Sequence, residues 1–115
     1  MKNILGMLFL LVVTACSVAP NTPAQSIYLI ENNFRAALVV AVTYKELPQC
    51  GTALVKLCSE PEVVKKLQTT YDVANASLMA AEIAVRSGGN ADRAINAAQQ
   101  AVIALTAITS TLEVK

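Results

Sequence analysis

The stretch SEPEVVKKLQTTYDVANASLMAAEIAVRSGG, residues 59–89, carries the clearest structural pattern of this 115-residue chain. Apolar side chains recur in it at alternating spacings of three and four residues, which is the period of one face of an α-helix. We therefore expect one long amphipathic helix that packs through this stripe. The stripe consists of Val64, Leu67, Tyr71, Ala74, Leu78, Ala81 and Val85.

Both ends of this stretch carry helix-boundary signals. Ser59 and Glu62 have the spacing of a capping box, in which the serine accepts from an early amide and the glutamate bonds back. Pro61 fits the first turn, where proline removes no helical hydrogen bond. Gly88 and Gly89 fit the other end, because glycine readily adopts the left-handed conformation that follows a helix.

A second stripe with the same spacing follows this helix. Asn90 or Asp92 is expected to cap a helix at its start, because both side chains accept hydrogen bonds from free amides. The spacing predicts that this helix also buries one face. Its stripe consists of Ile95, Ala98, Val102, Leu105, Thr109 and Leu112.

A further helix is expected before residue 59, ending near Leu47, because Pro48 and Gly51 follow. Residues 36–42 are apolar throughout, which is more than one buried face requires. Either this helix lies deepest in the fold, or Val39, Val40 and Val42 meet a partner protein or a second copy of the chain; we expect the first. Its stripe consists of Ile27, Ile30, Phe34, Ala37, Ala41 and Tyr44.

The chain begins with Lys2 and an apolar segment of ten residues, Ile4–Val13, that ends in Val13-Thr14-Ala15-Cys16. About 20 residues are needed to cross a bilayer, so this segment is too short for a membrane span. We interpret it as an export signal. The end of the segment resembles the lipobox of bacterial lipoproteins. The resemblance implies that residues 1–15 are removed by signal peptidase II, and that Cys16 carries a diacylglycerol on sulfur and usually an acyl chain such as palmitate on nitrogen. Ser17 implies sorting to the outer membrane.

Two other interpretations of this segment fit less well. Cleavage after Ala19 would have small residues at the required positions, Ser17 and Ala19, but Pro20 would follow the cut. A retained transmembrane anchor would be too short, and the helix breakers Pro20 and Pro23 follow it.

Lipidation of Cys16 would leave Cys50 and Cys58 as the remaining cysteines. An exported chain enters an oxidising space, where paired cysteines persist as disulfides. A zinc site would need two more ligands, and the sequence has no histidine. A redox-active pair is usually spaced as C-x-x-C. We therefore predict a structural disulfide.

Loop lengths then predict the topology. A connection of about four residues forces the last two helices into an antiparallel hairpin. The connection between the first two is longer, but its disulfide holds the helix ends together. The chain is expected to be all-α, an antiparallel up-down-up three-helix bundle over residues 26–115. Residues 16–25 would form the lipidated N-terminus and a tether.

Composition argues against several classes of function. Nine basic and eight acidic residues leave no electrostatic footprint for nucleic acid. The usual general base, histidine, is absent, and no serine lies in a nucleophile-elbow motif. We expect no catalytic residues, no metal site and no cofactor, and attachment to the membrane through acyl groups.

The segments Leu47-Pro48-x-Cys50 and Leu57-Cys58-Ser59, between alanine-rich helices, resemble small helical lipoproteins encoded by phages and prophages of proteobacteria. The resemblance implies a lysis accessory, a superinfection-exclusion protein or a component of the virion membrane. The alternative is a host scaffold or inhibitor that acts through the apolar face of the first helix. Either protein would be anchored in the outer membrane, with its body in the periplasm or at the cell surface.

Overall fold

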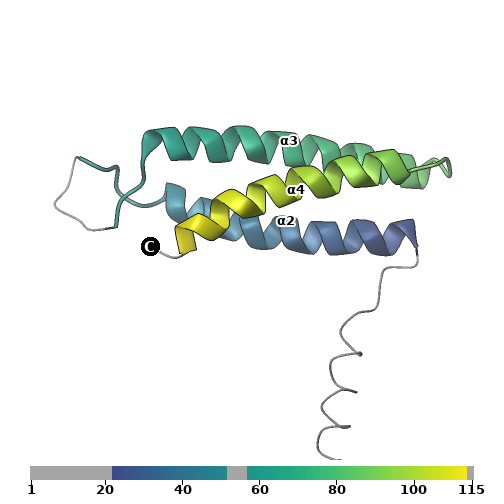
Figure 1. Ribbon diagram of the computed structural model, residues 1–115, viewed down its shortest axis with the longest axis horizontal. Helices are drawn as coiled ribbons and strands as arrows, with labels where there is room; N and C mark the ends of the chain where they lie inside the picture. The colour runs from purple at the N-terminus through teal and green to yellow at the C-terminus, as the bar shows by residue number, and fades with distance from the viewer. Residues whose placement is uncertain (1–21, 52–56, 114–115) are drawn as a thin grey trace, which may run out of the picture.

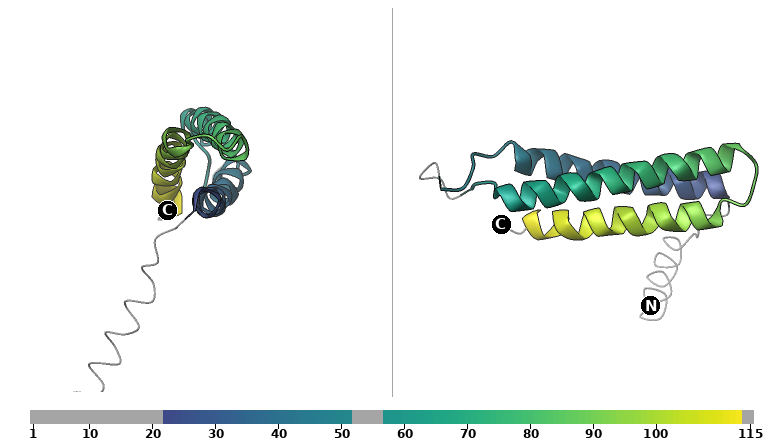
Figure 2. Two further views of the ribbon diagram at one scale, coloured as in Figure 1. Left: turned by 90° about the vertical axis from the view of Figure 1, so that its right-hand side faces the viewer. Right: turned by 90° about the horizontal axis from the view of Figure 1, so that it is seen from above.

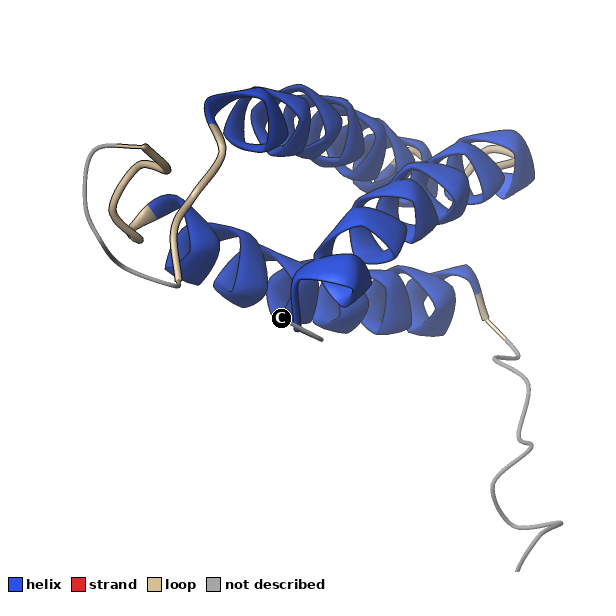
Figure 3. Ribbon diagram, turned by 60° about the vertical axis from the view of Figure 1, so that its left-hand side comes forward, coloured by secondary structure: helices blue, strands red, loops and turns tan. Residues whose placement is uncertain are grey.

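A computed structural model describes residues 22–51 and 57–113 of the chain. This part of the chain contains three α-helices, α2 (Pro23–Lys45), α3 (Pro61–Arg86) and α4 (Asp92–Glu113). Helix α3 runs antiparallel to α2 and α4, and all three pack against one another (Figures 1 and 2). The predicted all-α three-helix bundle is confirmed. Figure 3, in which the side with the α2–α3 connection is turned forward, shows the three helices arranged as a bundle.

The core is built from the predicted stripes. In α4, five of the six predicted positions are buried and Leu112 is partly buried. Tyr44, Tyr71 and Val85 pack at the rim, and the Tyr71 ring stacks on Phe34 with centroids 5.4 Å apart. The buried apolar residues are Ile27, Ile30, Phe34, Ala37, Ala41, Leu67, Ala74, Leu78, Ala81, Ala91, Ile95, Ala98, Val102 and Leu105.

Alanine forms much of the contact between the helices. Ala74, Ala81 and Ala98 have no exposed surface. A methyl side chain lets two helix backbones approach closely, but it contributes little apolar area. The larger buried side chains, such as Leu105, therefore provide a large share of the hydrophobic stabilisation.

Helix α2 begins earlier than predicted. The expected tether extended to residue 25, whereas the helix starts at Pro23 with Thr22 as its N-cap. The Thr22 hydroxyl accepts a hydrogen bond from the Gln25 amide at 3.2 Å. Threonine followed by proline is a helix-start signal, because proline is favourable in the first turn. Pro23 thus begins a helix in place of breaking one.

The predicted capping box at the start of α3 is wrong. The N-cap is Glu60, which makes no side-chain cap hydrogen bond. Ser59 lies one position too early, and it is buried with 2% of its surface exposed. Its hydroxyl donates to the Leu47 carbonyl oxygen at 3.0 Å, so it joins the two ends of the α2–α3 connection. Pro61 occupies the first turn, as predicted.

The α3–α4 connection is short and forms the expected hairpin. Gly88 has a φ of +73°, a left-handed conformation that disfavours other residues. Of the two candidate caps for α4, Asn90 makes the bond: its side-chain oxygen accepts from the Asp92 amide at 3.0 Å. This arrangement supplies a partner for one of the free amides at the helix start.

Candidate functional site

The α2–α3 connection is closed by the predicted disulfide. Cys50 and Cys58 are bonded, with their Cα atoms 4.9 Å apart. Two backbone hydrogen bonds lie beside it: the Cys50 amide donates to the Ser59 carbonyl at 3.0 Å, and the Ser59 amide donates to the Pro48 carbonyl at 2.8 Å. We call the disulfide, these two bonds and the Ser59–Leu47 bond the clasp. It holds the end of α2 against the start of α3.

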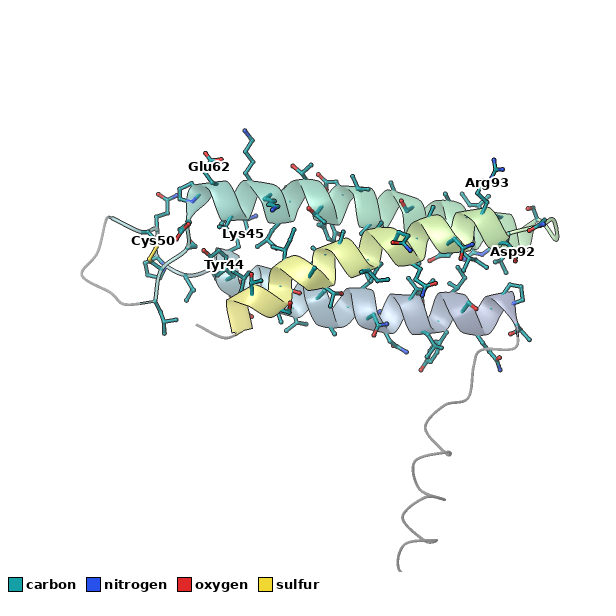
Figure 4. All side chains as sticks on the ribbon, viewed as in Figure 1. Tyr44, Lys45, Cys50, Glu62, Asp92 and Arg93 are labelled. Atoms are coloured by element: carbon teal, nitrogen blue, oxygen red, sulfur yellow. A yellow bond between two sulfur atoms is a disulfide. The ribbon has the colours of Figure 1, made fainter. Side chains whose placement is uncertain are left out.

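Tyr44 adds a further link at the same end of the bundle. Its hydroxyl accepts a hydrogen bond from the Glu60 backbone amide at 3.0 Å. Tyr44 and Lys45 lie at the end that carries Cys50, opposite the end with Asp92 and Arg93 (Figure 4). The hydroxyl of Tyr44 supplies a partner for an amide at the start of α3 that has none within the helix.

The three valines proposed as a partner face do not share one face. Val39 is 67% exposed and points away from the core, and Val42 is 45% exposed. Val40 is half-buried. At 3.6 residues per turn, Val40 and Val42 lie on opposite flanks of α2. The preferred expectation, that this helix lies deepest in the fold, is therefore wrong, because it exposes two of the three valines.

Val42 instead lines a groove between α2 and α3, beside the clasp. The groove has a volume of about 220 Å³. Val64, expected in the core stripe, also lines it, and Lys45 is the one charged residue among the described residues of its lining. The groove can accept an apolar side chain, with a cation at its edge. Its walls include Leu38, Val42, Lys45, Val64, Gln68 and Tyr71.

A larger groove of about 600 Å³ lies between α2 and α4. Ile30 and Val102 form its buried floor, with 7% and 3% of their surface exposed. Leu29 and Ile103 form its walls and are about half exposed. None of the described residues that line this groove is charged. Leu29 and Ile103 lie outside the predicted stripes, so the sequence pattern did not indicate this groove.

The acidic and basic side chains among the described residues are exposed or half-buried. The described residues contain no cluster of three or more histidine, cysteine, aspartate or glutamate side chains that could hold a metal ion. Each buried side-chain nitrogen or oxygen among them has a hydrogen-bond partner. The one ion pair in this part of the chain joins Glu82 to Arg86 on the surface of α3 at 3.7 Å.

The predicted lipidation site, Cys16, and the neighbouring Ser17 lie outside the described residues. The same holds for the predicted leader, residues 1–15. Within residues 22–51 and 57–113, none of the helices has both the length and the hydropathy that a membrane crossing requires.

Comparison with known proteins adds no family assignment. No family model matches the chain, and neither the curated proteins nor the solved structures include a significant match.

Proposed function

We propose that this protein is a lipid-anchored, non-enzymatic lipoprotein of the bacterial outer membrane, and that its three-helix body is a binding module in the periplasm or at the cell surface. The observation that carries the proposal is the sequence Val13-Thr14-Ala15-Cys16 at the end of a short apolar segment. A second feature agrees with it: Cys50 and Cys58 form a disulfide, which is typical of proteins in oxidising compartments.

Acyl chains would supply the membrane affinity in this proposal. Removal of Lys2 with the leader leaves eight basic and eight acidic residues, so no net positive charge draws the body to anionic lipids. Each buried methylene contributes about 0.8 kcal/mol, and two or more chains anchor stably where a single chain binds reversibly. Anchoring therefore depends on Cys16 rather than on the helical body.

We expect Cys16→Ser to abolish acylation completely, because serine has no thiol to accept the diacylglycerol. The full-length protein is produced in a diderm bacterium supplied with labelled palmitate, and its intact mass is measured. The wild-type protein should lose residues 1–15 and gain acyl mass, and it should fractionate with the outer membrane. The matched control is Ser17→Ala, which keeps the cysteine and should remain acylated. A wild-type protein with an intact leader, or without acyl mass, would refute the proposal.

The groove between α2 and α3 is the surface we assign to a protein partner. Val42 is almost half exposed there, and Lys45 adds a positive charge at its edge. An apolar side chain next to a carboxylate would match both features. A partner bound at this surface would fit a phage-encoded role, and it would equally fit the second candidate function, a host scaffold or inhibitor. Neighbouring genes separate the two, because lysis or tail genes beside this one would indicate a phage origin.

We expect Val42→Asp to reduce partner capture at least tenfold, since a carboxylate in the groove removes the apolar contact. Chemical crosslinking in membranes, affinity purification and mass spectrometry provide the measurement. Val73→Asp is the matched control, because Val73 is 55% exposed on α3 and lies outside this groove. Thermal unfolding should be nearly unchanged in both variants. Equal capture by the wild-type protein and Val42→Asp would exclude this surface as the binding site.

A further inference from the structure

We propose that the groove between α2 and α4 binds a second copy of this chain, so that two bundles pack side by side with their α2 and α4 helices in contact. The side-by-side orientation rests on the proposed lipid anchor, whereas the choice of groove rests on the chemistry of its described residues.

Large apolar side chains are exposed on both walls of the groove. Leu29 is 47% exposed on one wall of the groove and Ile103 is 52% exposed on the other. Beneath them, Ile30 and Val102 continue the apolar surface into the core. Large apolar side chains on both sides of one groove mark a surface that association would remove from water. The volume of about 600 Å³ leaves room for side chains of a partner.

The charge of the lining residues distinguishes the two grooves. In a two-fold symmetric interface, residues near the axis face their own copies, so a charged residue there meets a like charge. None of the described residues lining this groove is charged. The other groove differs in this respect, because a second copy bound there would bring a second Lys45 into the same interface. Charge therefore favours self-association at the α2–α4 groove and a different partner at the α2–α3 groove.

Both walls of the groove also carry polar side chains. Asn33 and Gln99 carry amide groups, which both donate and accept hydrogen bonds. The hydroxyls of Thr106 and Ser110 already donate to the Val102 and Ala107 carbonyls of their own helix. Their oxygens keep capacity to accept, so an amide of one copy can bond to a hydroxyl of the other. The walls can thus form hydrogen bonds with a second copy of themselves, and no charged side chain among their described residues opposes this.

Helix α2 begins beside this groove. The Ser26 amide donates to the Thr22 carbonyl at 3.1 Å, and Ser26 lines the groove, so the chain enters α2 at the groove. Cys16 is six residues before Thr22, a distance of at most about 20 Å. Helices α2 and α4 run in the same direction (Figure 1). Two bundles side by side would therefore direct both anchors into one membrane, and confinement there raises the effective concentration of each copy for the other.

The test introduces one thiol into the full-length chain. Ile103→Cys places it on a groove wall, and Ile83→Cys places it on α3, where Ile83 is 64% exposed outside the groove. Mild oxidation in native membranes should join Ile103→Cys into a covalent dimer and leave Ile83→Cys at least tenfold less crosslinked. Equal crosslinking of the two variants, or adducts with other proteins instead of the dimer, would overturn the inference.

Charge variants provide a second measurement that does not depend on a thiol. Ile103→Lys should weaken the dimer at least tenfold in sedimentation of the full-length protein in detergent, and mixing with Ile103→Glu should restore a heterodimer. Ile83→Lys should have no effect. All variants should unfold at nearly the wild-type temperature, because both isoleucines are more than half exposed. A dimer that persists unchanged in Ile103→Lys would overturn the inference.

Measuring the intact mass of the protein in the same samples tests the proposed anchor and the proposed dimer independently. An acylated but monomeric protein would refute the dimer and leave the lipoprotein proposal intact. A dimer without acyl mass, which also forms in Cys16→Ser, would support the groove and refute the anchor.

Discussion

Leu105→Ala should lower the free energy of unfolding by about 2–5 kcal/mol, the range for removing a large buried side chain. Leu105 has no exposed surface and is the largest side chain buried to this degree in the described part of the bundle. Ala74, Ala81 and Ala98 are also fully buried and are too short to fill the cavity that truncation leaves. We therefore expect a cost in the upper half of the range.

Thermal and urea-induced unfolding followed by circular dichroism measure this effect. For a domain of this size, each kcal/mol lowers the unfolding temperature by about 4–8 °C, so the shift should exceed about 10 °C. Ile83→Ala is the control, because it removes a similar side chain that is 64% exposed. It should cost less than about 1 kcal/mol, as surface changes usually do. Equal losses in the two variants would mean that Leu105 is not in the core.

Removal of the Cys50–Cys58 disulfide is the second change with a large expected effect. A cross-link that closes a loop of about nine residues contributes about 2.6 kcal/mol in the chain-entropy description, because it restricts the unfolded chain. The sequence separation of its cysteines is 8. The double variant Cys50→Ala/Cys58→Ala should therefore unfold about 10–20 °C below the wild-type protein. The backbone bonds of the clasp should keep the folded state populated at room temperature.

The measurement compares unfolding with and without a reductant. Reduction should lower the unfolding temperature of the wild-type protein to nearly that of the double variant. The double variant is the control, because a reductant has no disulfide to act on there. If the unfolding temperature of the wild-type protein did not respond to reduction, the disulfide would contribute nothing to stability.

Periodicity predicted the helices and most of the core correctly, since a stripe buried in a bundle must repeat every three or four residues. Ile95, Ala98, Val102 and Leu105 illustrate this, because all four are buried in α4. The disulfide followed from counting cysteines. The capping box failed although serine is a favoured cap residue and glutamate is not. The Ser59 hydroxyl bonds instead to the Leu47 carbonyl, which is distant in sequence.

The binding surfaces were the least predictable part. A continuous apolar run such as residues 36–42 has no period, so it does not indicate which side of the helix is covered. The structure separates Val40 from Val42 and places Val42 in a groove. Leu29 and Ile103 lie outside both stripes, and nothing in their local sequence indicates that they line one groove between α2 and α4.

The sequence by itself determined the number of helices, the face that each helix buries, their antiparallel order and the pairing of Cys50 with Cys58. These features depend on local spacing and on short connections, which can be recognised from neighbouring residues alone. Only the tertiary structure decided the bonding of Ser59, the position of Val42 and the two grooves beside α2. Each of these depends on how closely two helices approach, and that distance is set by side chains that are far apart in the chain.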